Sequence, residues 1–184
     1  MKLKLSLLVL VLALQTAWIL GTTFIQERTL AAGTVISLET RLVDPRDLLR
    51  GDYVTLNYKI SDVAFDLFSS ARTNQVPPGQ TVYVALEPRG QFYEVVRAST
   101  EELAPAAGQV LLKGRSQSRW NSATAKTVRV LYGLESYYVR EGTGNPRGKK
   151  LTVQAAVPAS GQARIKEVFI EGKPYAEAMK DFTR

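Results

Sequence analysis

The sequence predicts a mainly β fold, an antiparallel β-sandwich or open barrel, carried on one N-terminal transmembrane helix and accompanied by one or two short helices. The first observation behind this prediction is one uncharged, apolar run over residues 5–25. The second is a succession of short segments in which apolar and polar residues alternate, separated by Gly, Pro, Asn and Asp. Such segments, without long helices between them, are typical of antiparallel β domains.

The apolar run is long enough to cross a bilayer, because about 21 helical residues span about 31 Å, close to the hydrocarbon thickness. Lys2 and Lys4 precede the run and Trp18 lies towards its far end, which favours a cytoplasmic N-terminus. We therefore expect a cytoplasmic segment at 1–4, a signal-anchor at 5–25 and a periplasmic β-rich domain at 26–184, in a single-pass protein of the inner membrane. The alternative is a cleaved signal peptide, since small residues follow at 31–33, but the length of the run favours a retained anchor.

The other elements are predicted from alternation and from turn residues. Strands are expected over 36–42, 52–60, 81–86, 91–97, 109–114, 127–132, 151–158 and 163–170. The third and fourth strands should form a hairpin closed by a loop at 87–90, and the last two should form another. Ser61 and Asp62 are expected to cap a short amphipathic helix with its apolar residues over 63–68, and the prolines at 77–78 are expected to end it. Residues 134–139 fit either one helical turn or a continuation of the preceding strand, and 115–126 and 141–150 are expected to be loops.

One stretch, residues 43–58, is expected to organise the domain. Asp44 and Pro45 predict a turn, because proline fixes φ and the aspartate side chain accepts backbone N–H bonds. Gly51 permits a positive φ or a bulge just before the strand, and Asp52 would then bond neighbouring backbone amides. The alternation that follows predicts a half-buried strand with these residues on its inner face: Val54, Leu56, Tyr58 and Ile60.

These residues resemble the GDYXXLXY proteins, a bacterial family named after its motif. The motif is complete, and its residues are Gly51, Asp52, Tyr53, Leu56 and Tyr58, preceded by the turn Asp44, Pro45 and Arg46. A second segment also looks similar and contains Tyr132, Gly133, Glu135, Tyr138, Glu141 and Gly142; a third covers 168–175. The resemblance extends over roughly residues 30–175 and implies a membrane-anchored extracytoplasmic domain. It implies a location rather than a reaction.

Composition excludes several classes of chemistry. The chain contains neither cysteine nor histidine, which removes disulfides, thiolate metal sites, lipid attachment through cysteine and Ser-His-Asp catalysis. We expect no cofactor. The net charge is +7, or +5 (22 minus 17) once Lys2 and Lys4 are set aside, and the excess is spread among acidic residues. Such a distribution indicates a solvated surface, so no nucleic-acid partner is expected.

The remaining polar clusters have a structural interpretation that we favour. Asp44, Asp47 and Asp52 offer carboxylates to a hard cation, but arginines lie between them and the spacing differs from a calcium loop, so no metal site is expected. Neither methionine follows a serine, which removes the nucleophile box of a signal-peptidase-like Ser–Lys dyad. Residues 142–148 lack the Lys-Ser/Thr of a phosphate-binding loop. The motif tyrosines are expected in the core rather than on a binding surface.

Together these observations favour a non-enzymatic accessory or interaction protein of the bacterial envelope, with another membrane protein as its partner. The alternative is an envelope hydrolase or saccharide-binding protein that uses Asp52, Glu135 and Tyr138. The two hypotheses differ in the position of Asp52. A catalytic Asp52 must open into a cleft, whereas a structural one should be buried against backbone amides.

Overall fold

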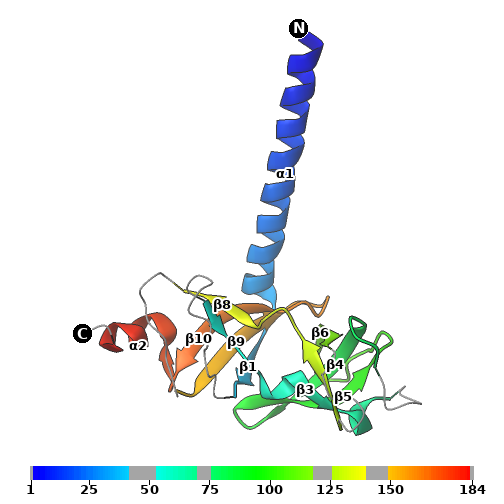
Figure 1. Cartoon of the computed structure of the whole chain (residues 1–184), viewed down its shortest axis with the longest axis vertical. Coiled ribbons are helices and arrows are strands. Elements are labelled where there is room, and N and C mark those ends of the chain that lie inside the picture. The colour runs from blue at the N-terminus through cyan, green and yellow to red at the C-terminus, as the bar shows by residue number, and fades with distance from the viewer. Residues whose placement is uncertain (1, 42–52, 70–75, 118–125, 140–148, 183–184) are drawn as a thin grey trace.

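The computed structural model describes residues 2–41, 53–69, 76–117, 126–139 and 149–182, and shows an N-terminal helix rising from a β domain (Figure 1). Within these residues the strands form three antiparallel sheets. The prediction of a mainly β fold with a long apolar helix is therefore confirmed. The motif turn, with Asp44, Pro45, Arg46, Gly51 and Asp52, lies outside the described residues, as do Glu141 and Gly142.

The first sheet has four strands in the order β1-β9-β10-β11. Their bounds are Thr34–Glu39, Leu151–Val157, Arg164–Ile170 and Lys173–Pro174. The predicted hairpin of the last two long strands, β9 and β10, is present, with a bulge between Ile165 and Glu167. β1 joins this hairpin because Thr34 to Glu39 pair with Val157 to Thr152.

The second large sheet has five strands in the order β3-β7-β6-β4-β5. Their bounds are Asp62–Ala64, Thr127–Leu131, Val110–Gln117, Thr81–Arg89 and Phe92–Ser99. The predicted hairpin of β4 and β5 is confirmed, but the loop predicted at 87–90 is wrong. β4 runs on to Arg89, which pairs with Phe92, so the turn contains only Gly90 and Gln91; Gly90 has φ +62°.

A third sheet of two strands joins β2, Tyr53–Thr55, to β8, Ser136–Tyr138. Residues 134–139 thus contain a strand. The motif strand is shorter than predicted, because a 3₁₀ turn follows at Lys59–Ser61. The alternation nevertheless holds beyond the strand: Val54, Leu56, Tyr58 and Ile60 are all buried.

The helix predicted at 63–68 is wrong. Residues 62–64 form strand β3, in which Val63 pairs with Val128, and a single 3₁₀ turn follows at Phe65–Leu67. Strand pairing with β7 therefore overrides the weak local helical spacing. An unpredicted helix, α2, covers Tyr175–Phe182 directly after Pro174, and it buries Tyr175, Ala178 and Met179. This i, i+3, i+4 spacing was the sequence signal for it.

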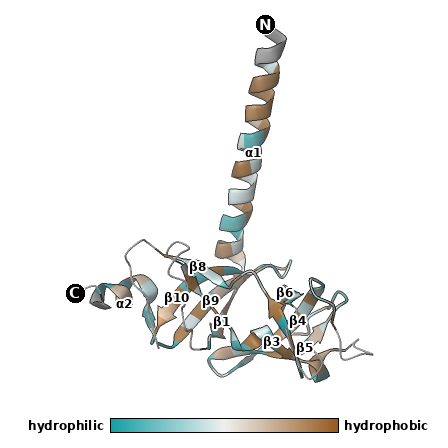
Figure 2. Cartoon of the chain, in the orientation of Figure 1, coloured by the Kyte–Doolittle hydropathy of each residue, from teal (hydrophilic) through white to brown (hydrophobic). Residues whose placement is uncertain are grey.

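One hydrophobic core joins the two large sheets, with Ile36, Leu38, Val84, Leu112 and Val153 fully buried. Helix α1, Lys2–Ala32, lies outside this core and is mainly hydrophobic, with a few hydrophilic bands along its length (Figure 2). At about 1.5 Å per residue its 31 residues are about 46 Å long, and they exceed the predicted span at the C-terminal end.

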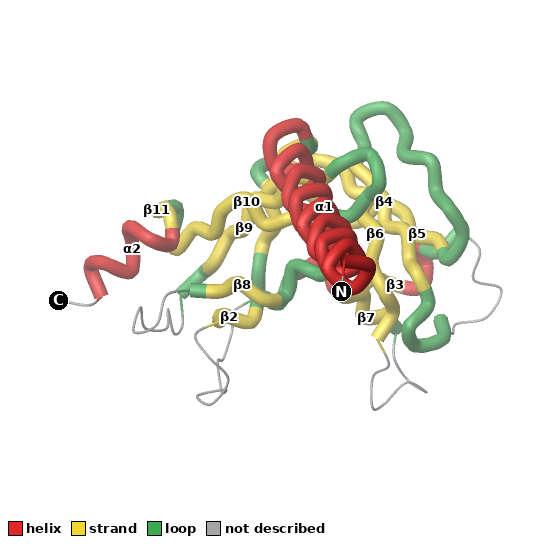
Figure 3. Tube along the Cα trace, turned by 90° about the horizontal axis from the view of Figure 1, so that it is seen from above, coloured by secondary structure: helices red, strands yellow, loops and turns green. Residues whose placement is uncertain are grey.

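Gly33 joins α1 to the four-stranded sheet. Its N–H donates to the Thr29 carbonyl at 2.9 Å, and a Cβ on it would lie 3.0 Å from the Val157 nitrogen. Only glycine allows the helix end and β9 to approach so closely. Viewed from above, the two larger sheets lie on either side of α1 (Figure 3).

Candidate functional site

The two sequence motifs, about 80 residues apart in the chain, lie side by side. Tyr53 pairs with Tyr138, Val54 with Tyr137, and Thr55 with Ser136. The pairing continues past the strands, because the Leu56 N–H donates to the Glu135 carbonyl at 2.8 Å. The GDYXXLXY-like stretch therefore forms a two-stranded sheet with the second segment that the sequence singled out.

Two tyrosines fasten these segments reciprocally. The Tyr58 hydroxyl donates to the Leu134 carbonyl at 2.7 Å, and the Tyr132 hydroxyl donates to the Ile60 carbonyl at 2.8 Å. The two tyrosines are 1% and 5% exposed. Burial, with a smaller contribution from the negative charge of Glu135, raises the pKa of both phenols well above its usual range. Each tyrosine thus stays neutral and donates a hydrogen bond from its own segment to a backbone carbonyl of the other segment.

The turn between these contacts is held by Glu135 and Gly133. A Glu135 carboxylate oxygen accepts the Tyr132 backbone N–H at 2.6 Å, and Gly133 has φ +77°. A residue with a Cβ is strained at that φ. β6 contributes Gly114, since a Cβ there would lie 2.5 Å from Val130 Cγ1 and 2.7 Å from the Leu131 carbonyl. The glycines let the chain fold tightly beside Tyr132.

The other predicted motif residues differ in burial. Leu56 is fully buried, whereas Tyr138 is 81% exposed on β8. Tyr53 lies in β2, and only its backbone pairing is described. The expectation of core tyrosines thus holds for Tyr58 and Tyr132 but not for Tyr138. The position of Asp52, which was to distinguish a structural from a catalytic role, lies outside the described residues.

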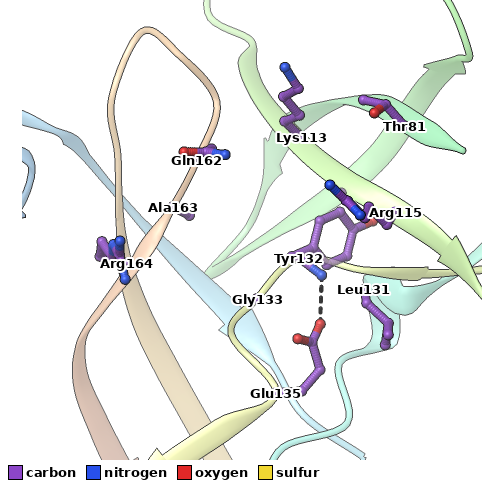
Figure 4. A pocket seen from close by; sticks show the side chains of 11 residues that line it. Thr81, Lys113, Arg115, Leu131, Tyr132, Gly133, Glu135, Gln162, Ala163 and Arg164 are labelled. Atoms are coloured by element: carbon purple, nitrogen blue, oxygen red, sulfur yellow. Dashed lines mark hydrogen bonds between the residues drawn. The ribbon is translucent and has the colours of Figure 1, made fainter. Parts of the chain in front are cut away.

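A cleft of about 620 Å³ opens beside the second motif, between the two large sheets (Figure 4). One wall carries Lys113 and Arg115 from β6, and the opposite wall carries Arg164 from β10. Glu135 lies between the walls, with its carboxylate turned to the Tyr132 amide. The volume of the cleft is within the range of small-ligand sites, about 300–1,000 Å³. Among the described lining residues, three cations stand against one carboxylate, which gives this part of the cleft a basic character.

A second polar cluster, which the sequence analysis missed, lies at the far end of β1. The Glu39 carboxylate bonds Lys59 at 2.5 Å and Lys150 at 2.8 Å. These two ammonium groups, Lys150 first, lower the pKa of Glu39 below its usual value. Nothing in the spacing of these three residues could have predicted the cluster, because β1, the turn at 59–61 and the start of β9 meet only in the folded chain.

Beside it, Asp62 is held by Arg41 and lies 3.9 Å from Arg129, which also bonds Asn57. Both acidic residues border a hollow of about 250 Å³ lined also by Phe92 and Tyr93. Each carboxylate is already surrounded by cations, so this cluster fastens elements together rather than offering a free acid. Among the described residues no group of three acidic side chains is placed to hold a metal ion.

Comparison with known proteins gives one finding. The family model described as GDYXXLXY protein matches residues 15–168, which is most of the chain. No curated protein and no solved structure matches the chain. The matched range includes both interlocked segments and the C-terminal half of α1.

Proposed function

The chain belongs to the GDYXXLXY protein family, and from that premise we propose that it is a membrane-anchored accessory protein of the bacterial envelope. In this proposal α1 stays in the inner membrane, the β domain lies in the periplasm, and the span of α1 binds the span of another membrane protein. The domain itself performs no catalysis.

The exposed surface of α1 carries the proposal. Residues 6–32 form the one described helix long and apolar enough to span a membrane, and none of its apolar window is buried against the domain. Among the residues that the structure describes, the exposed large hydrophobic side chains other than Val35 and Tyr138 all belong to this helix. In water, that surface would cost on the order of 10–20 kcal/mol, at about 1.5–3 kcal/mol per fully exposed large side chain and with most of these side chains a little over half exposed. A signal sequence passes the same test of length and composition, so the experiment below checks for cleavage.

A polar residue at the centre of the span supports a helical partner. Gln15 is exposed and lies ten residues, or about 15 Å, from either end of the predicted span at 5–25. Thr22 follows seven residues later on the same face, although its hydroxyl is already bonded to the Ile19 carbonyl. An amide in the hydrocarbon lacks water to bond, and facing helices commonly satisfy it. The Gln15 face is thus the expected contact.

The site geometry supports a scaffold role for the motifs. Tyr58, Tyr132 and Leu56 are occupied in holding the two segments together. Of the two described residues in the hydrolase hypothesis, Glu135 lines the cleft and Tyr138 does not, while Asp52 is outside the described residues. Glycoside hydrolysis ordinarily requires two carboxyl groups across a cleft. The one carboxylate among the described lining residues is bonded to a backbone amide, which supports that alternative poorly.

The experiment is site-specific photo-crosslinking in native membranes. A photoreactive residue is placed at Val11 or Ile19, which flank Gln15 on its face, and at Ala13 or Ala17 on the opposite face, given 100° per residue. We expect one crosslinked product of a different protein from the first pair only. Crosslinks from both faces alike, or a product of twice the chain's own mass, would contradict the proposal.

Two variants complete this test. Gln15→Leu should abolish the crosslinked product and co-purification of that protein. The matched control is Thr16→Val, which removes a hydroxyl already bonded to the Leu12 carbonyl and should leave both unchanged. N-terminal and C-terminal tags on the same chain report whether the span is retained, since loss of the N-terminal tag would identify a cleaved signal.

A further inference from the structure

The basic cleft lies at the end of the domain from which α1 leaves. Thr34, two residues after the helix, pairs with Val157, and its neighbour Val35 pairs with Ala156. Ala156 pairs in turn with Arg164 across the sheet. Two strand spacings of about 4.8 Å place the Arg164 backbone about 10 Å from that of Val35.

The opposite wall, formed by β6, is also bonded to the β9–β10 hairpin near the end of α1. The Lys113 N–H donates to the Gly161 carbonyl at 2.9 Å, which joins β6 to the turn between β9 and β10. Gly161 has φ +78°, and a Cβ on it would lie 3.3 Å from the Lys113 nitrogen. The turn can approach β6 this closely because residue 161 is a glycine. Both walls of the cleft therefore begin next to the C-terminal end of α1 at Ala32, which we call the foot of the helix.

The length of α1 places this foot at the lipid headgroups. If residues 5–25 cross the hydrocarbon, residues 26–32 extend about 10 Å beyond it. The headgroup layer is about 5–7 Å thick on each side of the bilayer. The cleft thus lies at or just outside the headgroups, within about one Debye length of their charges.

The cations of the cleft are available for an anion. In the described part of the chain, the ion pairs involve neither Lys113, Arg115 nor Arg164, although the Lys113 ammonium lies 5.3 Å from the centre of the Tyr83 ring. Arg115 and Arg164 are exposed. Glu135 is the one acidic residue among the described lining residues, and it directs a carboxylate oxygen to the Tyr132 amide. Guanidinium groups on two facing walls suit a phosphate, whose oxygens accept bonds from both sides.

We propose that this cleft binds the phosphate of an anionic phospholipid headgroup, with Arg115 and Arg164 as its main ligands from opposite walls and Lys113 beside them. The bound headgroup would hold the domain against the bilayer and bridge the two large sheets. This inference requires that α1 span the membrane, but it requires no partner protein. The proposed partner and the lipid site can therefore fail separately.

The test uses the full-length chain alone, reconstituted into nanodiscs of an equal mixture of phosphatidylglycerol and phosphatidylcholine. Native mass spectrometry after release from the disc then identifies lipids that stay bound. We expect a single phosphatidylglycerol on the wild-type chain. Arg115→Gln/Arg164→Gln should reduce its retention about tenfold or more, as loss of charge-assisted hydrogen bonds predicts.

The matched control, Arg89→Gln/Arg97→Gln, removes the same charge elsewhere and should retain the lipid. Arg89 ends β4 eight residues from Thr81 of the cleft, about 26 Å away along the strand. Equal loss in both double variants would overturn the proposal, because it would show nonspecific charge attraction. Equal retention of phosphatidylcholine would overturn it too, because the cleft would then not select an anionic headgroup. Displacement of the lipid by equimolar inorganic phosphate would also overturn it, since a soluble phosphate compound would then be the ligand. Thermal melts of all variants show that each is folded.

Discussion

Replacing Tyr58 by phenylalanine should destabilise the domain measurably. The ring is 1% exposed and its hydroxyl donates to the Leu134 carbonyl at 2.7 Å. The variant keeps the apolar ring but leaves a buried carbonyl without this donor, which typically costs about 1–3 kcal/mol. For a chain of this size that corresponds to a fall in melting temperature of about 2–12 °C.

The assay is thermal and chemical unfolding of the full-length chain in mild detergent, followed by circular dichroism. Tyr138→Phe is the control, because it makes the same chemical change in the second motif at a side chain that is 81% exposed. Exposed substitutions usually change stability by less than about 0.5 kcal/mol. If both variants melted at the wild-type temperature, the hydrogen bond from the Tyr58 hydroxyl to the Leu134 carbonyl would not stabilise the domain, and the reasoning would be refuted.

The two buried tyrosines, Tyr58 and Tyr132, should make the stability of the domain depend on pH. Burial raises the pKa of Tyr58 and Tyr132 above that of a tyrosine in the unfolded chain, near 10. The stabilisation is therefore complete below about pH 10 and is lost as pH rises further, because only the unfolded chain then releases these protons. Tyr58→Phe/Tyr132→Phe should lose less of its stability between neutral pH and pH above 10 than the wild type does. An equal loss in both proteins would contradict this assignment.

Three further predictions concern other elements. Gly33→Ala should destabilise the junction of helix and sheet by about 1–3 kcal/mol, since the new Cβ would lie 2.6 Å from a backbone oxygen, whereas Gly21→Ala, with nothing within 4 Å, should be neutral in the same melts. Gly114→Ala, whose Cβ would meet backbone and side-chain atoms of the next strand at 2.5–2.7 Å, should cost a similar amount and lower the denaturant midpoint. Glu39→Gln should reduce stability at neutral pH but not in acid. The pKa of Glu39, lowered chiefly by Lys150, makes its contribution present above about pH 4.5 and lost as pH falls through the lowered value; equal effects at both pH values would refute it.

Much of the fold was predictable because its signals are local. The apolar run predicted α1, and alternation predicted β1 and the hairpins β4–β5 and β9–β10. The errors occur where local and tertiary preferences compete. Residues 62–64 became a strand because β7 pairs with them, and the motif strand did not reach Ile60 because a 3₁₀ turn forms at Lys59–Ser61. Helix α2 was missed although Tyr175, Ala178 and Met179 carried its spacing.

The candidate site was predictable only as two separate segments. The sequence singled out Tyr58 and Tyr132 but not the exchange of hydrogen bonds between their segments, which are more than 70 residues apart. The cleft was not predicted at all. The sequence predicts a loop for Arg115 and a strand for Arg164, and no spacing rule relates the two residues.

The sequence alone determined properties that depend on composition and on neighbours along the chain. These are the apolar span, the period-2 strands and the exclusion of cysteine and histidine chemistry. The tertiary structure decided which distant residues meet: the two motifs across β2 and β8, the ion pairs around Glu39, and the basic cleft at the foot of α1. The physical reason is that burial and alternation are set residue by residue, whereas a partner across a sheet depends on how the whole chain closes around its core.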